Sequence, residues 1–268
     1  NALGSDQVQA LNSAQVQALS TGQVSAMSST VLESLSSAQV KALTSSQLNA
    51  LNAASLQAIE TADVAAMSSA QVGALSSAQM NNLTTDQVQA LNTGAVKAVT
   101  TTTLQALSTD QLSALTSDQV QALTTSQVQA LGTAQVRDMA STQLQNLSSS
   151  QVKALTSSQL NILTIDSLQA IETADLKEMT TAQINALSSA QLNKLSTDQL
   201  QALTTAQVKA LSETQLNGLD MDHVSALSST QLQALTSAQA QSLTTVMLNN
   251  LTTDQVPVLN STSVAAIN

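Results

Sequence analysis

The chain has 268 residues but contains no Phe, Tyr, Trp or Cys, and only 9% of its residues are charged. The lack of cysteine excludes disulfides and thiolate metal sites. It also means that the sequence does not indicate an oxidising or a reducing compartment. The net charge of −10, with seven Lys and Arg, argues against nucleic acid or an anionic membrane surface as a partner. Since large globular cores normally use aromatic side chains, we expect a narrow aliphatic core.

An eight-residue phrase repeats from one end of the chain to the other without insertion or deletion, and residues 36–43 (SSAQVKAL) are a clean copy. Aliphatic residues occupy every eighth position from Leu3 to Ile267, which makes a Leu series of thirty-four positions. A second, Val series has thirty-three members, of which only Ala240 is not a larger aliphatic. No linker interrupts the pattern, so we predict one domain over 1–268, an array of about 33 octads.

Each octad carries the signals of a helix start. The residue after each Leu-series member is Ser, Thr, Asn or Asp almost throughout, and such side chains accept hydrogen bonds from free backbone amides. Three residues later comes Gln in 23 of 33 octads, and Ser/Thr-x-x-Gln is a capping box. Leu35 and Val40, before and after the cap Ser36, have the spacing of a hydrophobic staple.

The period of eight decides between the ways in which these residues could be buried. In one continuous helix the apolar stripe would drift by about 80° per octad, so no fixed face could be buried. In a strand, the run Val40, Ala42, Leu43 breaks the alternation of faces, although a β-solenoid stays an alternative. We therefore predict an all-α repeat solenoid, a superhelical spiral with one capped helix of about six residues per octapeptide. Its core would hold the Leu series, the Val series and the Ala between them.

A longer repeat is superimposed on the octads. Residues 55–63 (SLQAIETAD) recur as residues 167–175, an offset of fourteen octads. We favour block duplication during growth of the array as the explanation of this offset, and a whole number of superhelical turns is the alternative. Both ends of the chain fall inside an octad and lack polar caps, so we expect an excerpt of a longer array.

Charged residues follow the octad frame. Eight Asp lie two residues after the cap, where a helix start favours negative charge: Asp6, Asp86, Asp110, Asp118, Asp166, Asp198, Asp222 and Asp254. Five of the six Lys and the single Arg directly follow the Val series: Lys41, Lys97, Arg137, Lys153, Lys177 and Lys209. We expect all of these side chains to belong to solvated faces.

Chemical motifs are few. The single His, His223, with Asp220 and Asp222 could offer ligands to a divalent metal, but His223 stands at the Gln position and Asp220 at the cap, so we favour a structural role. We interpret the pairs Glu60–Asp63 and Glu172–Asp175 in the same way, as replacements of cap and Gln. A catalytic Ser needs a positioned base, for which one His has no supporting motif. The sequence therefore predicts no catalytic, cofactor-binding or metal residue and no enzymatic activity.

Two further sequence features bear on the setting. No apolar run approaches eighteen residues, so we predict no membrane insertion. Asn-x-Ser/Thr sequons are expected by chance in a chain so rich in hydroxyls, and they stand at Asn82, Asn146, Asn250 and Asn260.

The phrase LTTSQVQAL at residues 123–131 resembles the octapeptide arrays of very large bacterial secreted and surface proteins, often labelled as adhesion or haem-utilisation proteins. The resemblance covers the whole chain and implies an extracellular, cell-surface location. It carries over no catalytic or haem-binding residue. Beyond His223, the chain has no plausible set of axial haem ligands.

Three functions are compatible with this pattern. We predict a non-enzymatic structural protein, a filament, fibre or adhesin stalk that associates with itself end to end or laterally. The alternative is a surface binding module that presents rows of Ser, Thr and Gln to glycan, mineral or ice. A calcium-dependent secreted repeat is disfavoured because Gly-rich, Asp-dense turns are absent.

Overall fold

The computed structural model describes residues 4–259 and 261–266, so Leu3, Ile267 and the sequon residue Asn260 lie outside the described residues. Contacts along the chain group into two compact units, Asn1–Met139 and Ala140–Asn268. We call them the first and second unit and describe each by itself. Both are built from the same octad, and the single domain over 1–268 stays a prediction.

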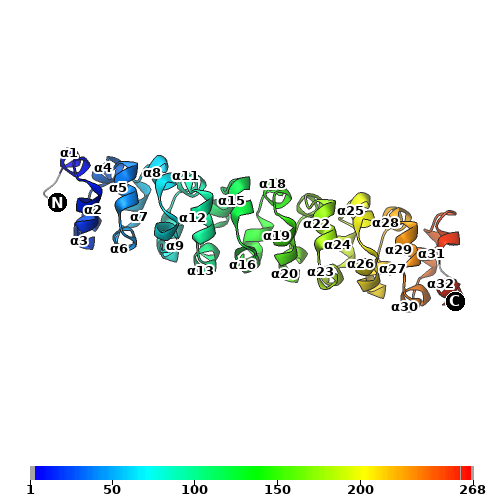
Figure 1. Ribbon diagram of the computed structural model, residues 1–268. Coiled ribbons are helices and arrows are strands. Elements are labelled where there is room, and N and C mark those ends of the chain that lie inside the picture. Colours follow the sequence, from blue (N-terminus) through cyan, green and yellow to red (C-terminus); the bar gives the residue numbers. More distant parts are fainter. Residues whose placement is uncertain (1–3, 260, 267–268) are drawn as a thin grey trace. The chain divides into compact units, whose positions relative to one another are not determined.

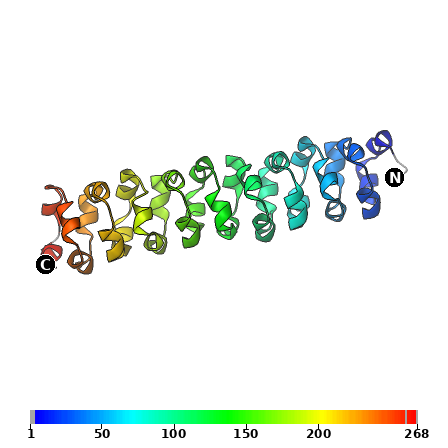
Figure 2. The same cartoon turned by 180° about the vertical axis from the view of Figure 1, so that it is seen from behind.

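The described residues of both units are helical, with one helix per octad (Figures 1 and 2). The first unit contains α1 (Ser5–Gln9), α2 (Ser13–Ala18), α3 (Thr21–Ser25), α4 (Ser29–Glu33), α5 (Ser37–Ala42), α6 (Ser45–Asn49), α7 (Ala53–Gln57), α8 (Thr61–Ala66), α9 (Ser69–Gly73), α10 (Ser77–Asn82), α11 (Thr85–Ala90), α12 (Thr93–Ala98), α13 (Thr101–Gln105), α14 (Thr109–Ser113), α15 (Ser117–Ala122), α16 (Thr125–Ala130) and α17 (Thr133–Arg137). The second contains α18 (Ser141–Gln145), α19 (Ser149–Ala154), α20 (Ser157–Asn161), α21 (Ile165–Gln169), α22 (Thr173–Glu178), α23 (Thr181–Ala186), α24 (Ser189–Leu192), α25 (Thr197–Ala202), α26 (Thr205–Ala210), α27 (Glu213–Asn217), α28 (Met221–Ala226), α29 (Ser229–Gln233), α30 (Ser237–Gln241), α31 (Thr245–Asn249), the 3-10 helix η1 (Val256–Val258) and α32 (Ser261–Ala266).

This architecture confirms the predicted all-α repeat solenoid. Helix lengths run from four residues in α24 to six in α5, close to the expected six. No strand occurs among residues 4–259 and 261–266, so the β-solenoid alternative is wrong. Gln, Ala and Ser are poor strand formers, and the local capping signals decide the outcome.

After a six-residue helix such as α5, two extended residues lead to the next helix, and after a five-residue helix one further residue precedes them. The cap Ser36 has φ −80° and ψ 159°, and its hydroxyl accepts a hydrogen bond from the Gln39 amide. At the other end of α5, Leu43 has φ −58° and ψ 135°, which stops the helix. In the described segments no residue has a positive φ. The turn therefore needs no glycine, which explains why the chain contains only six.

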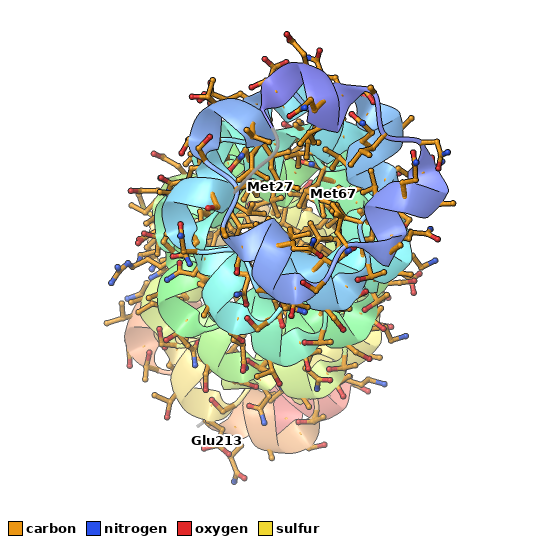
Figure 3. All side chains as sticks on the ribbon, turned by 90° about the vertical axis from the view of Figure 1, so that its left-hand side faces the viewer. Met27, Met67 and Glu213 are labelled. Atoms are coloured by element: carbon orange, nitrogen blue, oxygen red, sulfur yellow. The ribbon has the colours of Figure 1, made fainter. Side chains whose placement is uncertain are left out.

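The core of each unit is formed by the two aliphatic series. Val40 is fully buried and Leu43 is 3% exposed. In Figure 3, Met27 and Met67 of the Leu series point into the interior that the helices of the first unit enclose. The Ala between the two series was expected to be equally buried, but in most octads it is half-buried. The third buried position holds Gln instead, such as Gln39 at 4% exposure.

Contacts between turns give the pitch of the coil. Helices three octads apart pack together, as α9 and α12 do. The Gln57 side chain donates to the Asn82 carbonyl, 25 residues later. The Gln87 side chain donates to the carbonyls of Leu56 and Ile59, which are 31 and 28 residues earlier. The mean of these three separations is three and a half octads, which is the length of one turn.

Pro257 marks the one described octad that is not α-helical. Its segment forms η1, and the Val-series residue Val256 is 51% exposed there. Proline lacks the amide proton of an α-helical bond and clashes with the preceding turn. A tight 3-10 turn avoids both problems.

Replacing Leu115 by Asp tests the core assignment. Leu115 is 5% exposed, so the substitution leaves a cavity and buries an unpaired carboxylate. We expect a loss of about 3–5 kcal/mol in the free energy of unfolding, measured by chemical denaturation.

The matched control is Thr102→Asp, because Thr102 is exposed and stands where eight other octads carry Asp. We expect this variant to stay within about 0.5 kcal/mol of the wild type. Equal unfolding free energies for the two variants would contradict the assignment of the Leu series to the core.

Candidate functional site

The most distinctive chemical feature of both units is a row of buried glutamines, which we call the glutamine ladder. Gln87 is 2% exposed, and its Oε1 accepts a hydrogen bond of 3.0 Å from the Thr84 amide. Its Nε2 donates to the carbonyls of Leu56 and Ile59, at 2.8 and 2.7 Å. One side chain thus caps the start of its own helix and the end of the helix four octads earlier.

The ladder is present in both units. In the first unit, Nε2 donates to a carbonyl four octads earlier from Gln39, Gln47, Gln71, Gln111, Gln119, Gln127 and Gln135. In the second unit the donors include Gln183, Gln191, Gln199, Gln207, Gln215, Gln231, Gln239 and Gln255.

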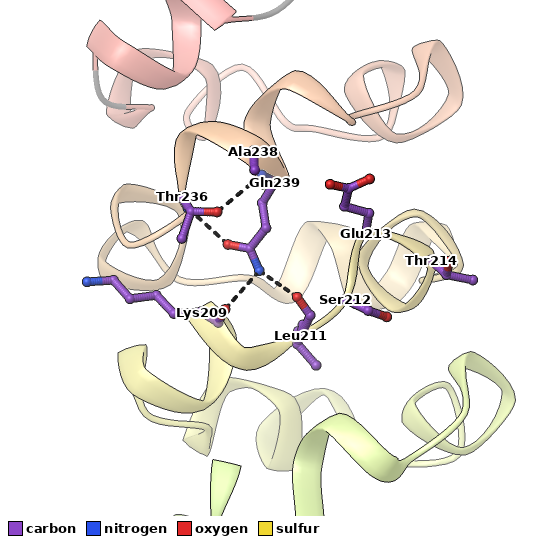
Figure 4. A pocket seen from close by; sticks show the side chains of 8 residues that line it. All are labelled: Lys209, Leu211, Ser212, Glu213, Thr214, Thr236, Ala238 and Gln239. Atoms are coloured by element: carbon purple, nitrogen blue, oxygen red, sulfur yellow. Dashed lines mark hydrogen bonds between the residues drawn. The ribbon is translucent and has the colours of Figure 1, made fainter. Parts of the chain in front are cut away.

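Figure 4 shows one step of the ladder in the second unit. Gln239 accepts from the Thr236 amide at 2.9 Å through Oε1. Its Nε2 points to the opposite side and donates to the Leu211 carbonyl at 2.8 Å and the Lys209 carbonyl at 3.4 Å. The Thr236 hydroxyl completes the cap by accepting from the Gln239 amide.

The ladder solves a problem that short helices create. A helix leaves four amides at its start and four carbonyls at its end without partners inside the helix. In a helix of five or six residues, most backbone polar groups therefore need partners from outside the helix. An unmade hydrogen bond at a buried group costs about 1–3 kcal/mol. The Gln side chain supplies an acceptor to one end and a donor to the other, which allows both ends to be buried.

Sequence analysis predicted the cap half of this arrangement and missed the ladder. A signal was present, because Glu and Gln serve equally in a capping box, yet none of the 33 octads has Glu at this position. A carboxylate could accept from the cap amide, but it could not donate to the earlier carbonyls.

A second set of side chains links each octad to the one three places later. The residue after the Val series donates to a backbone carbonyl 25 positions further along, as Gln57 does to Asn82 at 3.0 Å. Other donors of this kind are Gln9, Asn49, Gln105, Ser113, Asn161, Gln169, Asn193 and Asn217. An octad within either unit therefore lies between neighbours three octads on and four octads back.

His223 takes the place of a ladder glutamine. It is buried, its Nε2 lies 2.8 Å from the Leu195 carbonyl, and its Nδ1 lies 2.6 Å from the Asp220 carboxylate. Leu195 is 28 residues earlier, so Nε2 serves the same carbonyl that a Gln would serve. Both neighbours of the ring are oxygen atoms, and the roles of the two ring nitrogens depend on the tautomer.

Asp220 and Asp222 do not join His223 as a metal centre. The Asp220 oxygen that contacts the ring also accepts from the His223 amide at 3.0 Å, as a helix cap does. Among the described residues, no three His, Cys, Asp or Glu side chains lie close enough to hold a metal ion. Both ring nitrogens already contact oxygen atoms, so the ring has no free nitrogen to offer a haem iron.

The Asp220 carboxyl has its pKa shifted by this cap. Partial burial is the largest single influence and raises the pKa, but the His223 amide and ring together outweigh it. The pKa of Asp220 is therefore lowered below its ordinary value, which makes the carboxylate the favoured form in the fold.

The two acidic pairs also replace cap and Gln. Asp63 and Asp175 are buried at the ladder position, at 5% and 7% exposure. Each accepts a hydrogen bond from a serine of the same unit, Asp63 from Ser37 at 2.5 Å and Asp175 from Ser149 at 2.6 Å. The acids are thus integrated into the packing between turns, and in the described part of the chain they are not grouped with other ligands.

A surface pocket of about 480 Å³ lies beside the Gln239 step. Its lining combines a cation and an anion, Lys209 and Glu213, with hydroxyl groups from Ser212, Thr214 and Thr236 (Figure 4). These hydroxyls and the two charged groups give the pocket a polar lining.

The fold and the buried ladder define the class of the protein: an all-α solenoid of tandem octapeptides. A family model described as the ALTTAQ repeat matches six segments, namely residues 16–53, 56–93, 92–125, 128–165, 168–205 and 197–229. The chain belongs to the ALTTAQ repeat family. This confirms the octapeptide-array resemblance, whereas the bacterial surface setting stays a prediction.

Two other findings complete the comparison. No curated protein matches the chain. None of the described helices is both long and apolar enough to cross a lipid bilayer.

Gln87→Glu is the sharpest test of the ladder. Glu keeps the acceptor for Thr84 but turns an oxygen toward the Leu56 and Ile59 carbonyls, so two bonds are lost and a charge is buried. We expect about 2–4 kcal/mol less stability at neutral pH. Because the folded state would raise the pKa of this carboxyl, the loss should be smaller below about pH 4, where the acid is protonated and can donate.

The control is Gln89→Glu, which adds the same charge at an exposed position in the same helix. We expect its unfolding free energy to match that of the wild type within about 0.5 kcal/mol at both pH values. A ladder variant as stable as this control would refute the proposed role of Nε2.

Asp220→Asn tests the coupling of Asp220 to His223. Because the pKa of Asp220 is lowered in the fold, its carboxylate stabilises the protein above the ordinary value near 3.9. That contribution is lost as the pH falls through the lowered pKa. Melting temperatures should be recorded between about pH 2 and 7. The wild type should melt at a higher temperature than Asp220→Asn near pH 7 and at about the same temperature near pH 2. A difference independent of pH would contradict this.

Proposed function

We propose that this chain is a non-enzymatic structural array, a segment of an extracellular filament, fibre or adhesin stalk at a bacterial cell surface. The observation that carries the proposal is the glutamine ladder, which recurs with the same partners in both units. Wherever a buried ladder Gln occurs, its side chain fixes the octad to the octad four places earlier, whatever the exposed residues are. Such uniformity suits a protein whose task is length and stiffness.

The two sets of side-chain bonds support a mechanical role. In each unit they cross from one turn of the coil to the next, so pulling adjacent turns apart breaks buried hydrogen bonds and separates the aliphatic series at the same time. Each hydrogen bond broken in this way removes about 0.5–1.5 kcal/mol of net stabilisation, because the exposed amide is then hydrated by water. The load is shared, since every turn contains three or four octads.

The ladder also suggests how copies of the purified 268-residue segment would associate end to end. Gln7, Gln15 and Gln23 stand at ladder positions and are exposed in this segment. Their Oε1 atoms cap their own helices, as Gln7 does for Gly4 at 2.9 Å. In a stack of two segments their Nε2 atoms would donate to helix-end carbonyls of the second segment, as the ladder glutamines do inside each unit.

Electron imaging of the purified 268-residue chain over a concentration series tests this function. We expect fibres of constant width whose length grows with concentration. The triple variant Gln7→Glu, Gln15→Glu, Gln23→Glu removes the outward donors at exposed positions, so it should fold normally and form at least tenfold shorter fibres.

A control with the same added charge carries Gln17→Glu, Gln89→Glu and Gln201→Glu, all at exposed positions outside the ladder. It should form fibres like the wild type. Isolated particles of wild-type protein at every concentration would overturn the filament and leave a spacer, and equal fibres from both triple variants would overturn the role of the exposed glutamines.

A second candidate function, a surface binding module, is favoured by the pocket beside Gln239. Its hydroxyls and its opposite charges could hydrogen-bond a glycan, and Ser or Thr recurs on the exposed side of most octads. We expect a rise in melting temperature with a bound glycan, or altered growth of mineral or ice crystals. Glu213→Ser, which restores the common residue type of that position, should abolish a glycan effect that arises in this pocket.

A further inference from the structure

Seven charged side chains of the second unit, four Asp and three Lys, form two rows that follow the pitch of the coil, and Glu172, Glu178, Lys194, Glu213 and Asp220 lie outside these rows. Four exposed Asp occupy the same octad position: Asp166 on α21, Asp198 on α25, Asp222 on α28 and Asp254 just before η1. We call this row the acidic face. Three exposed Lys follow the Val series: Lys153 on α19, Lys177 on α22 and Lys209 on α26. We call this row the basic face.

Contacts between turns make the acidic face continuous. Gln199 of α25 donates to the Leu168 and Ile171 carbonyls at the end of α21, so the helices of Asp166 and Asp198 are neighbours. Helix α25 packs against α28, which carries Asp222. Gln255, next to Asp254, donates to the Val224 carbonyl of α28.

The basic face is continuous for the same reasons. Helices α19 and α22, with Lys153 and Lys177, pack together. Gln207 of α26 donates to the Leu176 carbonyl of α22 at 2.8 Å, which brings the octad of Lys209 beside that of Lys177.

The two faces point in different directions. Lys177 follows Asp166 by one octad and three further positions, and Lys209 follows Asp198 by the same interval. Since one turn takes three and a half octads, this interval is about two fifths of a turn, so the rows lie on nearly opposite sides of the coil. Neither of the two ion pairs found within the described segments, Arg137–Asp138 and His223–Asp220, includes a member of either face.

The rows also share one spacing. The step from Lys153 to Lys177 is three octads, and the step from Lys177 to Lys209 is four. The steps from Asp198 to Asp222 and on to Asp254 are three and four octads as well. A basic face of one copy therefore meets an acidic face of another copy with its charges at matching intervals along the coil.

The first unit carries Asp and Lys at the same octad positions on its own helices, with other spacings. Asp86, Asp110 and Asp118 lie on α11, α14 and α15, where α11 packs against α14 and Gln119 of α15 donates to the Val88 carbonyl of α11. Lys41 and Lys97 are seven octads apart, which is two turns, and Lys153 and Lys209 of the second unit have the same separation.

We propose that the array associates laterally with further copies of this chain, the basic face of one copy docking on the acidic face of the next. Because the two faces are different surfaces, the contact is heterologous and leaves one face of each kind free. Lateral growth is therefore open, and it produces ribbons or sheets of side-by-side arrays. This contact uses exposed flanks of the helices, so it is independent of the exposed ladder glutamines and of the filament proposal.

The test is a charge swap in the full 268-residue chain. One variant carries Lys153→Glu, Lys177→Glu and Lys209→Glu, and the other carries Asp198→Lys, Asp222→Lys and Asp254→Lys, the three acids with the matching intervals. Sedimentation velocity at low salt should show lateral assembly of the wild type, with at least a tenfold loss in each variant. Mixing the two variants should restore assembly, because the reversed faces are again opposite in charge.

Salt and a matched substitution provide the controls. Assembly should weaken severalfold above about 0.1 M salt, where the Debye length falls below about 10 Å. Lys194→Glu and Lys177→Glu change the net charge equally, but Lys194 lies outside the basic face, so only Lys177→Glu should weaken assembly.

Three outcomes would overturn the proposal: no lateral assembly of the wild type at low salt, two variants that assemble as well as the wild type, or a mixture that fails to recover. Assembly that requires added Ca²⁺ would overturn it as well, since it would mean that ions join two acidic faces. Circular dichroism of each variant confirms that the exposed substitutions leave the helices intact.

Discussion

The whole structure depends on the need to satisfy backbone groups at helix ends that are buried. With five or six residues per helix, nearly every amide and carbonyl is close to a terminus, and none of these helices would be stable alone. The aliphatic series bring the ends together, but burial alone would leave carbonyls such as those of Leu56 and Ile59 without donors. Gln87 and its equivalents remove that penalty, because a neutral amide both accepts and donates.

Substitutions at the ladder position support this view. His223 keeps the donor to a carbonyl 28 residues earlier and gains Asp220 as the partner of its other nitrogen. Asp63 has no proton to offer when ionised, and it turns to the hydroxyl of Ser37 instead. Variation is thus tolerated where a neighbouring side chain changes the local hydrogen bonding, and the coil continues through these octads in both units.

The fold could be predicted from the sequence because its signals are local. The capping box, the staple and the period of eight all act within one octad, so they determine the helices without knowledge of the tertiary structure. The pitch could not be derived, since it depends on how Leu and Val side chains of different turns pack. Without the pitch, neither the partners of Gln87 nor the alignment of Asp166 with Asp198 is visible in the sequence. The burial of the Ala position was overestimated for the same reason.

The ladder has a direction, and that direction bears on synthesis. The buried ladder glutamines donate to carbonyls that lie 28 to 31 residues toward the N-terminus. The residues that carry these carbonyls are therefore synthesised before the glutamine. An octad can complete these bonds as soon as it leaves the ribosome or an export channel, without waiting for distant C-terminal segments. The array can therefore fold one octad at a time, in the order of translation. Most of its contacts span about one turn, so even a very long chain of this kind never has to search for a remote partner.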